Sequence, residues 1–585
     1  MEHCLFLFHN VLPRLQMSLR VCLVVTVCSV LTIQCAEPIL PKKQVDRGLM
    51  ALPKAKGNVY ISWRLLQTDP TDIAFNLYRM DRYVGDFIQV NDCPLTQSTN
   101  FLDTTAVDQH AYWYLLKAIR NGREERRGAT TYVLAQSWEK PFRSIYFSGE
   151  YEARMAGIAD INGDGVLDYV IKQPNFNTDP YSNPGYWKRS KETYTLEAYD
   201  GVDGKLLWQY DMGWAIETGT WYSPYLVYDI DGDGSAEVYV KSGDGDPREW
   251  DGRVLNGPEY LAKLDGRTGR MLRKIDWLDR REFNTYNRAS RNFLTLAYLD
   301  GQQPSLIMQR GTYDIIKTLA LDKHLQTVWY WEAKGRDEGF QSQGGHGLIS
   351  ADVDADGRDE LVMGSAVLDD NGTGLWTSGL GHPDVCFVAD IDPRRPGLEI
   401  FFGIEPRRQS QGVCMADART GEIIWSYDGP TRHVHSMGML GDIDPNHPGM
   451  EGYAGEQDGS QYWLYAADGQ RISDISFGTL APLAVWWDAD QTKEVVARNE
   501  VFKYAGESLK TIEGRVLTAA DIMGDWREEI ITTLPGELRI YSTTTLADTR
   551  RTWLMQDRQY RVGVAAGTMG YYRQPKLGGI DMGNE

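Results

Sequence analysis

The sequence predicts an all-β protein, an eight-bladed β-propeller with a small N-terminal β-sandwich of the fibronectin or immunoglobulin sort. An acidic motif returns eight times at uneven intervals after about residue 160, and an apolar strand follows each copy. Such repeats indicate one small antiparallel sheet per unit, and sheets of this size become stable when they stack radially. Seven or nine blades and, more weakly, a right-handed β-helix with shorter coils are the alternatives.

Composition limits the classes of partner. The chain has 585 residues with 61 basic and 81 acidic side chains, a formal net charge of −20. This balance argues against nucleic-acid binding, which depends on neutralising phosphates. An acidic surface also repels polyanions unless a basic patch or a bound cation intervenes. The 32 tyrosines and 18 tryptophans suit an aromatic groove that faces sugars, although large β cores also use aromatic residues.

The N-terminus is predicted to be an export signal over residues 1–36. Arg20 precedes an apolar run, Val21 to Ile33, that is too short to span a bilayer. A secreted or periplasmic protein without a transmembrane span is therefore expected, and a lipid anchor at Cys35 is the less favoured alternative. The seven cysteines form no metal-type pair and allow one disulfide at most. A monomer is expected.

Two domains are predicted after the signal. Residues 45–136 hold alternating aromatic and apolar runs such as AYWYLLKAI, separated by turn residues and free of acidic ladders, which favours a β-sandwich. Residues 142–585 carry the repeats and form the predicted propeller. The eight copies of the acidic motif begin at Asp160, Asp229, Asp300, Asp352, Asp390, Asp442, Asp488 and Asp521.

The best copies of the motif suit calcium. They place carboxylates or an amide at positions 1, 3 and 5, a glycine at 6 and a further acid at 9. Calcium takes six to eight oxygen ligands, and such a loop supplies most of them. Because the loop returns once per unit, we expect several calcium ions that fix turns and take no part in catalysis. The predicted ligands are Asp160, Asn162, Asp164, Asp168, Asp229, Asp231, Asp233, Glu237, Asp352, Asp354, Asp356 and Glu360.

Several motifs resemble one family. QGGHGLISADVDADGRDELVMG, LDDNGTGLWTSGLGHPDV, DARTGEIIW, DIMGDWREEI, LRIYSTT and YRQP follow one another, with VDRGLMALP and SWRLLQTDP near the N-terminus. Together they resemble the rhamnogalacturonan lyases of polysaccharide lyase family 11, over nearly all of the mature chain. The resemblance implies an eight-bladed propeller with a small N-terminal β domain. It also implies calcium-assisted β-elimination in the uronate-containing pectin backbone.

The resemblance also implies a calcium site at the cleft, formed by His346, His382, Asp384 and Glu405. From the residues alone, His382 and Asp384 share one turn and could reach a common ion. Histidine is an unusual calcium ligand, so a turn-packing role for His346 stays open. The resemblance adds Tyr572 in YYRQP, suited to aromatic stacking or proton transfer.

Other positions depart from the family pattern. Its asparagine before the first ladder aligns with Arg154, and its following aspartate with Pro174. An arginine aligns with Met437, and a lysine with Glu513, two residues before Arg515.

Arg154 and Arg515 are therefore candidates to neutralise an acidic sugar. His433 and His435, in TRHVHSMG, are candidates for an alternative base, although each could be an ordinary loop histidine.

The sequence thus predicts a secreted lyase that acts on a rhamnose-uronate polysaccharide, of the rhamnogalacturonan type by default. The alternatives are a lyase for another such polymer, for example ulvan, or a catalytically silent propeller that binds acidic glycans. The third alternative is an adhesion or scaffold module whose turns are fixed by calcium. The paired histidines argue against it, because a purely structural calcium site does not need them.

Overall fold

The computed structural model describes residues 45–575 except 55–56, 82–84, 141, 180–185 and 220–221. The predicted export signal and Cys35 lie outside the described residues. Within the described part, Cys93, Cys386 and Cys414 form no disulfide. The described helices include none that is both long and apolar enough to cross a membrane. The structure is all-β, as the sequence predicts, with only short helices.

The N-terminal part consists of two antiparallel sheets. Buried aromatic and aliphatic side chains of this part, including Trp63, Phe75 and Tyr114, pack together in one core. Along the central strand of the larger sheet, buried and partly buried residues alternate, as the sequence pattern predicts. The smaller sheet has the order β1 (Met50–Lys54), β2 (Asn58–Ser62) and β5 (Asn100–Asp103). The larger sheet has the order β4 (Ile88–Gln89), β3 (Ala74–Asp81), β6 (Tyr112–Arg120) and β7 (Arg123–Glu124), and β8 (Ala129–Val133) also pairs with β6.

Eight four-stranded antiparallel sheets follow in chain order. The first four are β10 (Met155–Ala159), β11 (Asp168–Gln173), β12 (Thr195–Tyr199), β13 (Leu206–Asp211); β14 (Tyr225–Tyr228), β15 (Glu237–Gly243), β16 (Glu259–Leu264), β17 (Met271–Asp276); β18 (Asn292–Ala297), β19 (Ser305–Arg310), β20 (Lys317–Leu321), β21 (Thr327–Glu332); and β22 (Gly344–Ala351), β23 (Glu360–Gly364), β24 (Ala366–Leu368), β25 (Gly374–Thr377).

The other four sheets are β26 (Pro383–Ala389), β27 (Glu399–Ile404), β28 (Val413–Asp417), β29 (Ile423–Ser426); β30 (Met439–Gly441), β31 (Glu451–Gly455), β32 (Tyr462–Tyr465), β33 (Arg471–Ser473); β34 (Leu483–Val485), β35 (Glu494–Ala497), β36 (Glu500–Phe502), β37 (Ser508–Thr511); and β38 (Arg515–Ala520), β39 (Glu529–Leu534), β40 (Glu537–Tyr541), β9 (Arg143–Tyr146). The short helices are η1 (Ala135–Glu139), α1 (Tyr286–Ala289), η2 (Gly335–Phe340), η3 (Leu554–Gln556), α2 (Arg558–Ala566) and η4 (Gly567–Met569).

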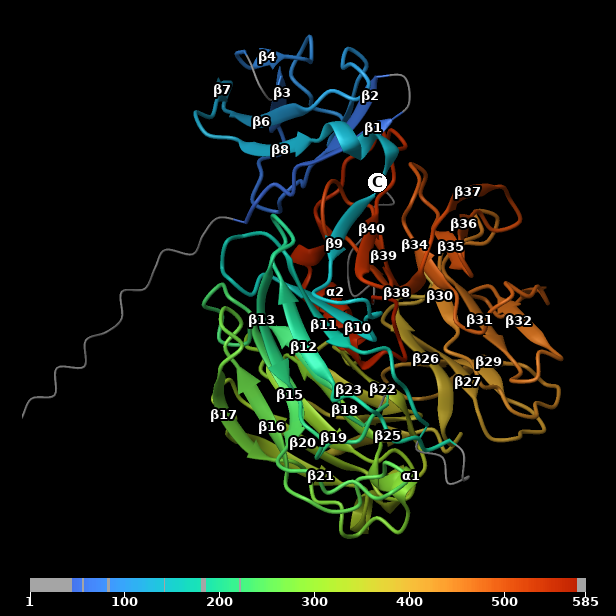
Figure 1. Cartoon of the computed structure of the whole chain (residues 1–585). Coiled ribbons are helices and arrows are strands. Elements are labelled where there is room, and N and C mark those ends of the chain that lie inside the picture. Colours follow the sequence, from blue (N-terminus) through green and yellow to red (C-terminus); the bar gives the residue numbers. More distant parts are fainter. Residues whose placement is uncertain are drawn as a thin grey trace, which may run out of the picture. The chain divides into compact units, whose positions relative to one another are not determined.

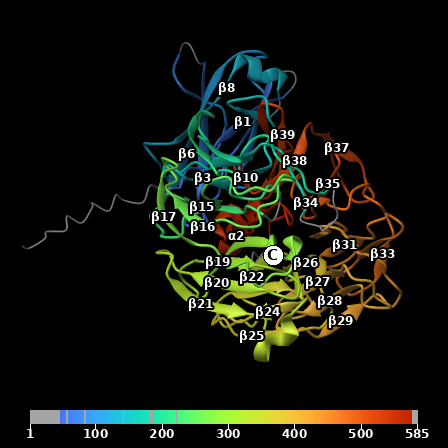
Figure 2. The ribbon, with the colours of Figure 1, turned by 60° about the horizontal axis from the view of Figure 1, so that its bottom comes forward.

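Burial falls from the first to the fourth strand of a sheet. Every residue of β14 is buried, whereas nearly all of β17 is exposed. The first strands of successive sheets contact one another from β10 to β34, β10 also contacts β38, and α2 packs against β10, β14, β18 and β22. Figure 2 shows the fourth strands β21, β25, β29 and β33 along the outside, with α2 further in. First strands are therefore buried along most of their length, because neighbouring sheets cover both of their faces.

The last sheet is completed by a strand from the other end of the chain. β9 pairs antiparallel with β40, with Ser144 opposite Arg539 and Ile145 opposite Leu538. In Figure 1, β9 runs beside the red strands β38 to β40. The sequence motifs do not reveal this pairing, because β9 carries no acidic ladder.

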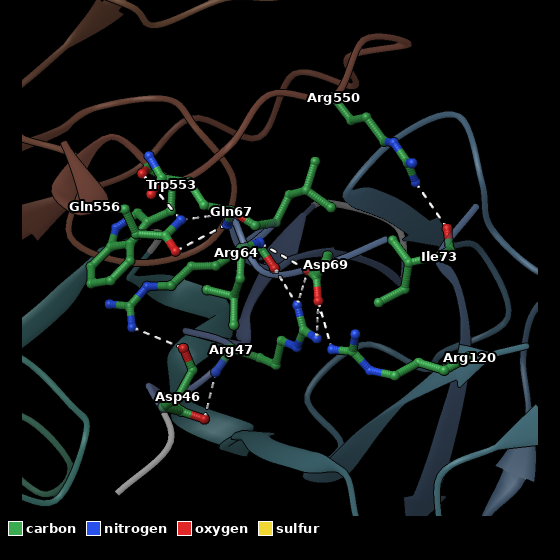
Figure 3. Close-up of polar contacts among 12 residues, drawn as sticks. Asp46, Arg47, Arg64, Gln67, Asp69, Ile73, Arg120, Arg550, Trp553 and Gln556 are labelled. Carbon is green, nitrogen blue, oxygen red and sulfur yellow. Dashed lines mark hydrogen bonds and ion pairs between the residues drawn. The ribbon is translucent and has the colours of Figure 1, made fainter. Parts of the chain in front are cut away.

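The N-terminal sheets are bound to the C-terminal segment by hydrogen bonds. Gln67 N–H donates to Gln556 Oε1 at 3.0 Å, and Arg550 Nη1 donates to Ile73 O at 2.9 Å. Figure 3 shows these contacts beside Asp69. The carboxylate of Asp69 accepts hydrogen bonds from Arg47 at 2.8 Å and from Arg120 at 2.7 Å. The first domain is therefore tied to the repeats by specific polar contacts.

Candidate metal and sugar site

A cluster of six side chains lies on three neighbouring sheets. His346 lies in β22, His382 directly precedes β26, Asp384 lies near its start, and Glu405 directly follows β27. His433 and His435 precede β30. The structure thus brings together the four residues implied by the family resemblance and adds the two histidines of TRHVHSMG. We call these six residues the histidine cluster.

The ligand-type atoms of the histidine cluster lie close together. His346 Nε2 and His382 Nε2 lie 3.1 and 3.4 Å from Asp384 Oδ1, and 3.2 Å from each other. His435 Nδ1 lies 2.6 Å from Asp384 Oδ2. On the other side, Glu405 Oε1 lies 3.0 Å from His433 Nε2 and 3.7 Å from His435 Nδ1, and Glu405 Oε2 lies 3.5 Å from His382 Nε2.

The histidine cluster is buried on one side and open on the other. The side chains of His346 and His382 are 3% exposed and that of Asp384 is fully buried, whereas His433 and His435 are 42% and 39% exposed. An ion held by the inner residues would therefore be reached from solvent past the two outer histidines.

The protonation of the histidine cluster reflects this burial. Burial lowers the pKa of His346 to about 4. Hydrogen bonding to Asp384 and Glu405 raises the pKa of His435 to about 10. Burial acts to raise the pKa of Asp384, but His346, His382 and His435 hold it well below its usual range. The carboxylates thus stay ionised and attract a positive charge, either a proton or a metal ion.

Irregular strands create this geometry. The pairing of β26 with β27 shifts register between Pro383 and Val385, so Asp384 lies in a bulge. The pairing of β22 with β23 is likewise interrupted between Gly344 and Ile349, around His346. A bulge turns a side chain away from the regular alternation and commonly occurs beside functional sites. His382 Nδ1 contacts the carbonyl oxygen of Gly344, which directs Nε2 into the cluster.

Tyr572 lies under the histidine cluster. Its hydroxyl donates to the backbone carbonyl oxygen of Asp384 at 2.8 Å, and burial raises its pKa well above the usual range. Tyr571 packs against the ring of His346, with ring centroids 4.7 Å apart. The hydroxyl of Tyr572 therefore stays protonated and supports the strand that carries Asp384.

Arginines form a second group. Arg515 Nη2 donates to the carbonyl oxygens of Ala153, at 2.5 Å, and Arg154, at 3.3 Å. Arg573 donates to Val516 O at 2.8 Å. Burial lowers the pKa of Arg515 and of Arg573 to about 10 and also lowers that of Arg154. Arg515 and Arg573 line a cavity of about 450 Å³.

Two members of this region were missed by the sequence reasoning. Arg573 lies beside Tyr572 in YYRQP, a signal that could have drawn attention to it. Lys172 is buried at the end of β11, and burial, with the charge of Arg154, lowers its pKa to about 7. An apolar strand context gives no indication of that lysine.

The acidic loops each join the first and second strands of a sheet. The loops at Asp229 and Asp352 bring at least three carboxylates within reach of one ion. The acid at position 9 (Asp168, Glu237 or Glu360) begins the second strand and accepts from the backbone N–H of position 2. In the loop at Asp160, the backbone N–H groups of Ile161 and Gly201 donate to the two oxygens of Asp168.

Some loops contain a protein cation. Lys503 Nζ lies 2.6 Å from both Asp488 Oδ2 and Asp490 Oδ2. In the degenerate loop at Asp521, Arg64 from the N-terminal part reaches the carbonyl of Ile522. Lys263 lies 3.6 Å from Asp231 and also contacts Glu237. In these loops a lysine or arginine side chain therefore lies where other loops could bind a metal ion.

Comparison with protein families gives two matches. Residues 42–134 match a model described as the rhamnogalacturonan I lyase β-sheet domain. Residues 144–585 match one described as the C-terminal domain of rhamnogalacturonan lyase family 11. Together the two matched ranges take in nearly all of the described chain.

Individual relatives agree with these matches. The chain is 35% identical to the rhamnogalacturonan endolyase YesW of Bacillus subtilis, over 91% of this chain and 90% of YesW. It is 34% identical to the exolyase YesX of the same organism, over 92% and 95%. A solved structure of the Bacillus licheniformis rhamnogalacturonan lyase PL11 superposes with a TM-score of 0.82 at 32% identity, covering 91% of this chain and 96% of that one.

Proposed function

This chain belongs to rhamnogalacturonan lyase family 11, a family of polysaccharide lyases, and we propose that it cleaves a rhamnose-uronate polysaccharide of the rhamnogalacturonan type by β-elimination. We also propose that it acts as a secreted or periplasmic monomer. That location follows from the sequence of residues 1–36, and an anchor at Cys35 is the alternative.

One observation carries this proposal: a group of arginines and a cluster of metal-ligand type share one segment of the chain. Residues 571–574 connect the two. Tyr571 and Tyr572 contact the histidine cluster, and Arg573 lines the cavity with Arg515. A uronate polymer needs both a binding site for its carboxylate and a polar centre at the reacting carbon.

The chemistry assigns roles to the arginines. A uronate C5 proton becomes acidic when its carboxylate charge is neutralised. A base then removes that proton, a double bond forms between C4 and C5, and the C4–O bond breaks with transfer of a proton to the leaving oxygen. We assign carboxylate neutralisation to Arg154 and Arg515, helped by Arg573. Tyr572 belongs to the floor of the site, where it positions Asp384, and His435 lies on the exposed side.

The acidic loops fit calcium by their donor atoms. Carboxylate and amide oxygens are the ligands that calcium prefers, and bound calcium would stabilise the turns. The loop at Asp352 is the best candidate for an occupied site, because Lys263 already lies beside the carboxylates of Asp231 and Glu237 in the loop at Asp229. The histidine cluster presents several imidazole nitrogens, so no step of the elimination is assigned to calcium there.

We further propose that the eight sheets are the blades of a β-propeller over residues 142–585 and that residues 45–136 form a β-sandwich. The sequential contacts of the first strands and the contact of β10 with β38 support a closed ring. The pairing of β9 with β40 supports closure between the two ends of the repeats.

The direct test is incubation with rhamnogalacturonan I, ulvan and homogalacturonan while the ultraviolet absorbance of unsaturated uronate is followed. An increase on rhamnogalacturonan I is expected. Cleavage of ulvan alone would favour the second candidate, a lyase for another rhamnose-uronate polymer, which the additional arginine at position 154 supports. Binding of these glycans without turnover would establish the silent propeller and refute the lyase.

A further inference from the structure

A cavity lined by arginines lies where the seventh and eighth sheets meet. Its volume is about 450 Å³, and its lining includes Arg498, Asn499, Arg515 and Arg573. Arg498 and Asn499 belong to the seventh sheet, between β35 and β36, and Arg515 begins the first strand of the eighth. The proposed function uses Arg515 and Arg573 for one uronate carboxylate and gives Arg498 no role.

Arg498 occupies a backbone position that suits smaller residues. It is the first of the two residues that connect β35 to β36, and Asn499 is the second. Its φ is +56°. Hairpins with two-residue loops favour glycine, asparagine or aspartate at positive φ, because other side chains are strained there. Strain of this kind gathers at functional sites. The arginine is therefore better explained by its guanidinium group than by the turn.

Neighbouring residues hold the Arg498 guanidinium at the cavity. Its Nε donates to Gly478 O at 3.2 Å. A Cβ atom at position 478 would collide with the guanidinium, so the glycine leaves the space that the group occupies. Asn499 Nδ2 donates to Gly514 O at 2.8 Å, which ties the turn to the residue before Arg515. The guanidinium thus has a defined place in the cavity wall, although Arg498 is an exposed residue.

The cavity carries more positive charge than one carboxylate neutralises. Arg498 and Arg573 donate to backbone carbonyl oxygens, which carry no formal charge. Arg515 Nε lies 4.0 Å from one carboxylate oxygen, Glu152 Oε2. Burial and then the charge of Arg154 lower the pKa of Arg515 and of Arg573, so these guanidiniums repel one another. One uronate carboxylate would therefore leave the cavity positive.

From the cavity, the turn and the charges we infer that Arg498 and Arg573 form a second anion subsite beside Arg515, which binds a sulfate ester on the sugar next to the reacting uronate. The inference rests on the proposed lyase function. Rhamnose and uronate alternate in a rhamnose-uronate backbone, so the neighbour of a uronate has no carboxylate of its own. A second anion in the same cavity is then an ester on that neighbour. A sulfate monoester has one negative charge and three terminal oxygens, which match the donors of a guanidinium.

The test uses the full mature chain and two probes, a methyl rhamnoside monosulfate and the same glycoside without sulfate. Neither probe contains a uronate, so neither is cleaved while its binding is followed by NMR titration. The variants are Arg498→Asn, which suits the turn, and Arg498→Lys, which keeps the charge but not the fork of donors. Arg281→Asn, at an exposed arginine paired with Asp279, is the matched control.

The wild-type chain and Arg281→Asn are expected to bind the sulfated probe about 10-fold more tightly than the neutral one or better. Arg498→Asn is expected to lose this preference while its apparent Tm stays equal or rises, because asparagine tolerates positive φ. Arg498→Lys is expected to keep part of the preference. Equal binding of the two probes by the wild type, or an unchanged preference in both Arg498 variants, would overturn the inference.

Initial rates on rhamnogalacturonan I and on a chemically sulfated sample of the same chain length extend the test to the polymer. The ratio of kcat/KM, sulfated over unsulfated, is expected to fall about 10-fold in Arg498→Asn. The two proposals fail separately. A protein that binds the sulfated probe through Arg498 but cleaves no polysaccharide refutes the lyase and leaves the subsite standing. A protein that cleaves rhamnogalacturonan I but binds both probes equally refutes the subsite and leaves the lyase standing.

Discussion

Burial decides what each charged side chain in the arginine region can do. Arg515 and Arg573 have lost much of their hydration, and backbone carbonyls receive their N–H groups. A partly desolvated guanidinium binds a carboxylate more strongly than one in water, because the local dielectric is lower. The arginines are thus suited to bind the carboxylate of a uronate.

Replacing Arg515 tests this role. Arg515→Gln is expected to lower kcat/KM on the cleaved polysaccharide about 10- to 100-fold, because it removes a charge that stabilises the developing carbanion. Initial rates of ultraviolet absorbance measure the effect. Arg281→Gln, at a highly exposed arginine paired with Asp279, is the control and should leave the rate unchanged. An Arg515→Gln enzyme as active as the wild type would remove Arg515 from the site.

Lys172 predicts a pH effect on stability. Its pKa is about 7 in the folded chain, because of burial and the charge of Arg154, against about 10.4 in an unfolded chain. Between these values the unfolded chain binds more protons, so stability rises with pH; the gain is complete above about pH 10.4 and is lost as pH falls through 7. We expect the unfolding free energy of the wild type to gain up to about 4 kcal/mol relative to Lys172→Met over this range. Denaturant unfolding at pH 7 to 10 measures it, and parallel pH profiles for the two proteins would contradict it.

At the scale of the secondary structure, the acidic loops and the bulges behave differently as sequence signals. The ladder is visible in the sequence because its ligands lie within nine residues of one another, and every copy joins two strands. The bulge at Asp384 is invisible, because it depends on the pairing of β26 with β27. Of the six residues in the histidine cluster, four were implied by the family resemblance, and His433 and His435 were only candidates for a base. His433 and His435 lie close to Glu405 and Asp384 only because three sheets pack together, and the sequence does not show this packing.

The loops predict a graded response to calcium. Chelation is expected to lower the apparent Tm, because ligands that bind only the folded chain stabilise it, by about 2.7 kcal/mol at a hundredfold excess over Kd. Asp354→Ala should abolish a part of this calcium-dependent increase. Asp490→Ala is the matched control, since Lys503 already neutralises that loop, and its effect should be the same with and without calcium. Thermal unfolding in calcium and in chelator makes the comparison, and equal calcium responses in all three proteins would refute the assignment.

At the scale of the whole molecule, the N-terminal sheets supply a missing cation to the last repeat. Arg64 donates to Asp46 O at 3.1 Å and to Ile522 O, and its guanidinium lies 3.8 Å above the ring of Trp553. The charges of Asp521 and Glu529 act on it. Met523 occupies the loop position where a carboxylate stands in the best copies. The first domain therefore takes part in the structure of the eighth sheet.

Removing this cation tests the coupling. Arg64→Met leaves the carbonyl oxygens of Asp46 and Ile522 without this donor and is expected to cost about 1–3 kcal/mol in unfolding free energy. Arg123→Met, at an exposed position in β7, should change stability little. Chemical denaturation of both variants measures the difference. A wild-type midpoint for Arg64→Met would show that the arginine is dispensable.

The sequence predicted the all-β class and the repeated units because each unit carries its own apolar strand and acidic turn. It did not predict which strand completes the eighth sheet, nor that Arg64 stands in the eighth loop. Both features depend on contacts between residues hundreds of positions apart, and local sequence patterns do not predict such contacts.

The pairing of β9 with β40 has a consequence for synthesis. The hydrogen-bonded residues Ser144 and Glu537 are 393 positions apart. At about 5 to 20 residues per second, a ribosome needs roughly 20 to 80 s to make that interval. During this time β9 has no partner, and the growing array presents open strand edges of the kind that template aggregation. Efficient production of this protein should therefore depend on chaperones that hold the nascent chain until its last fifty residues emerge.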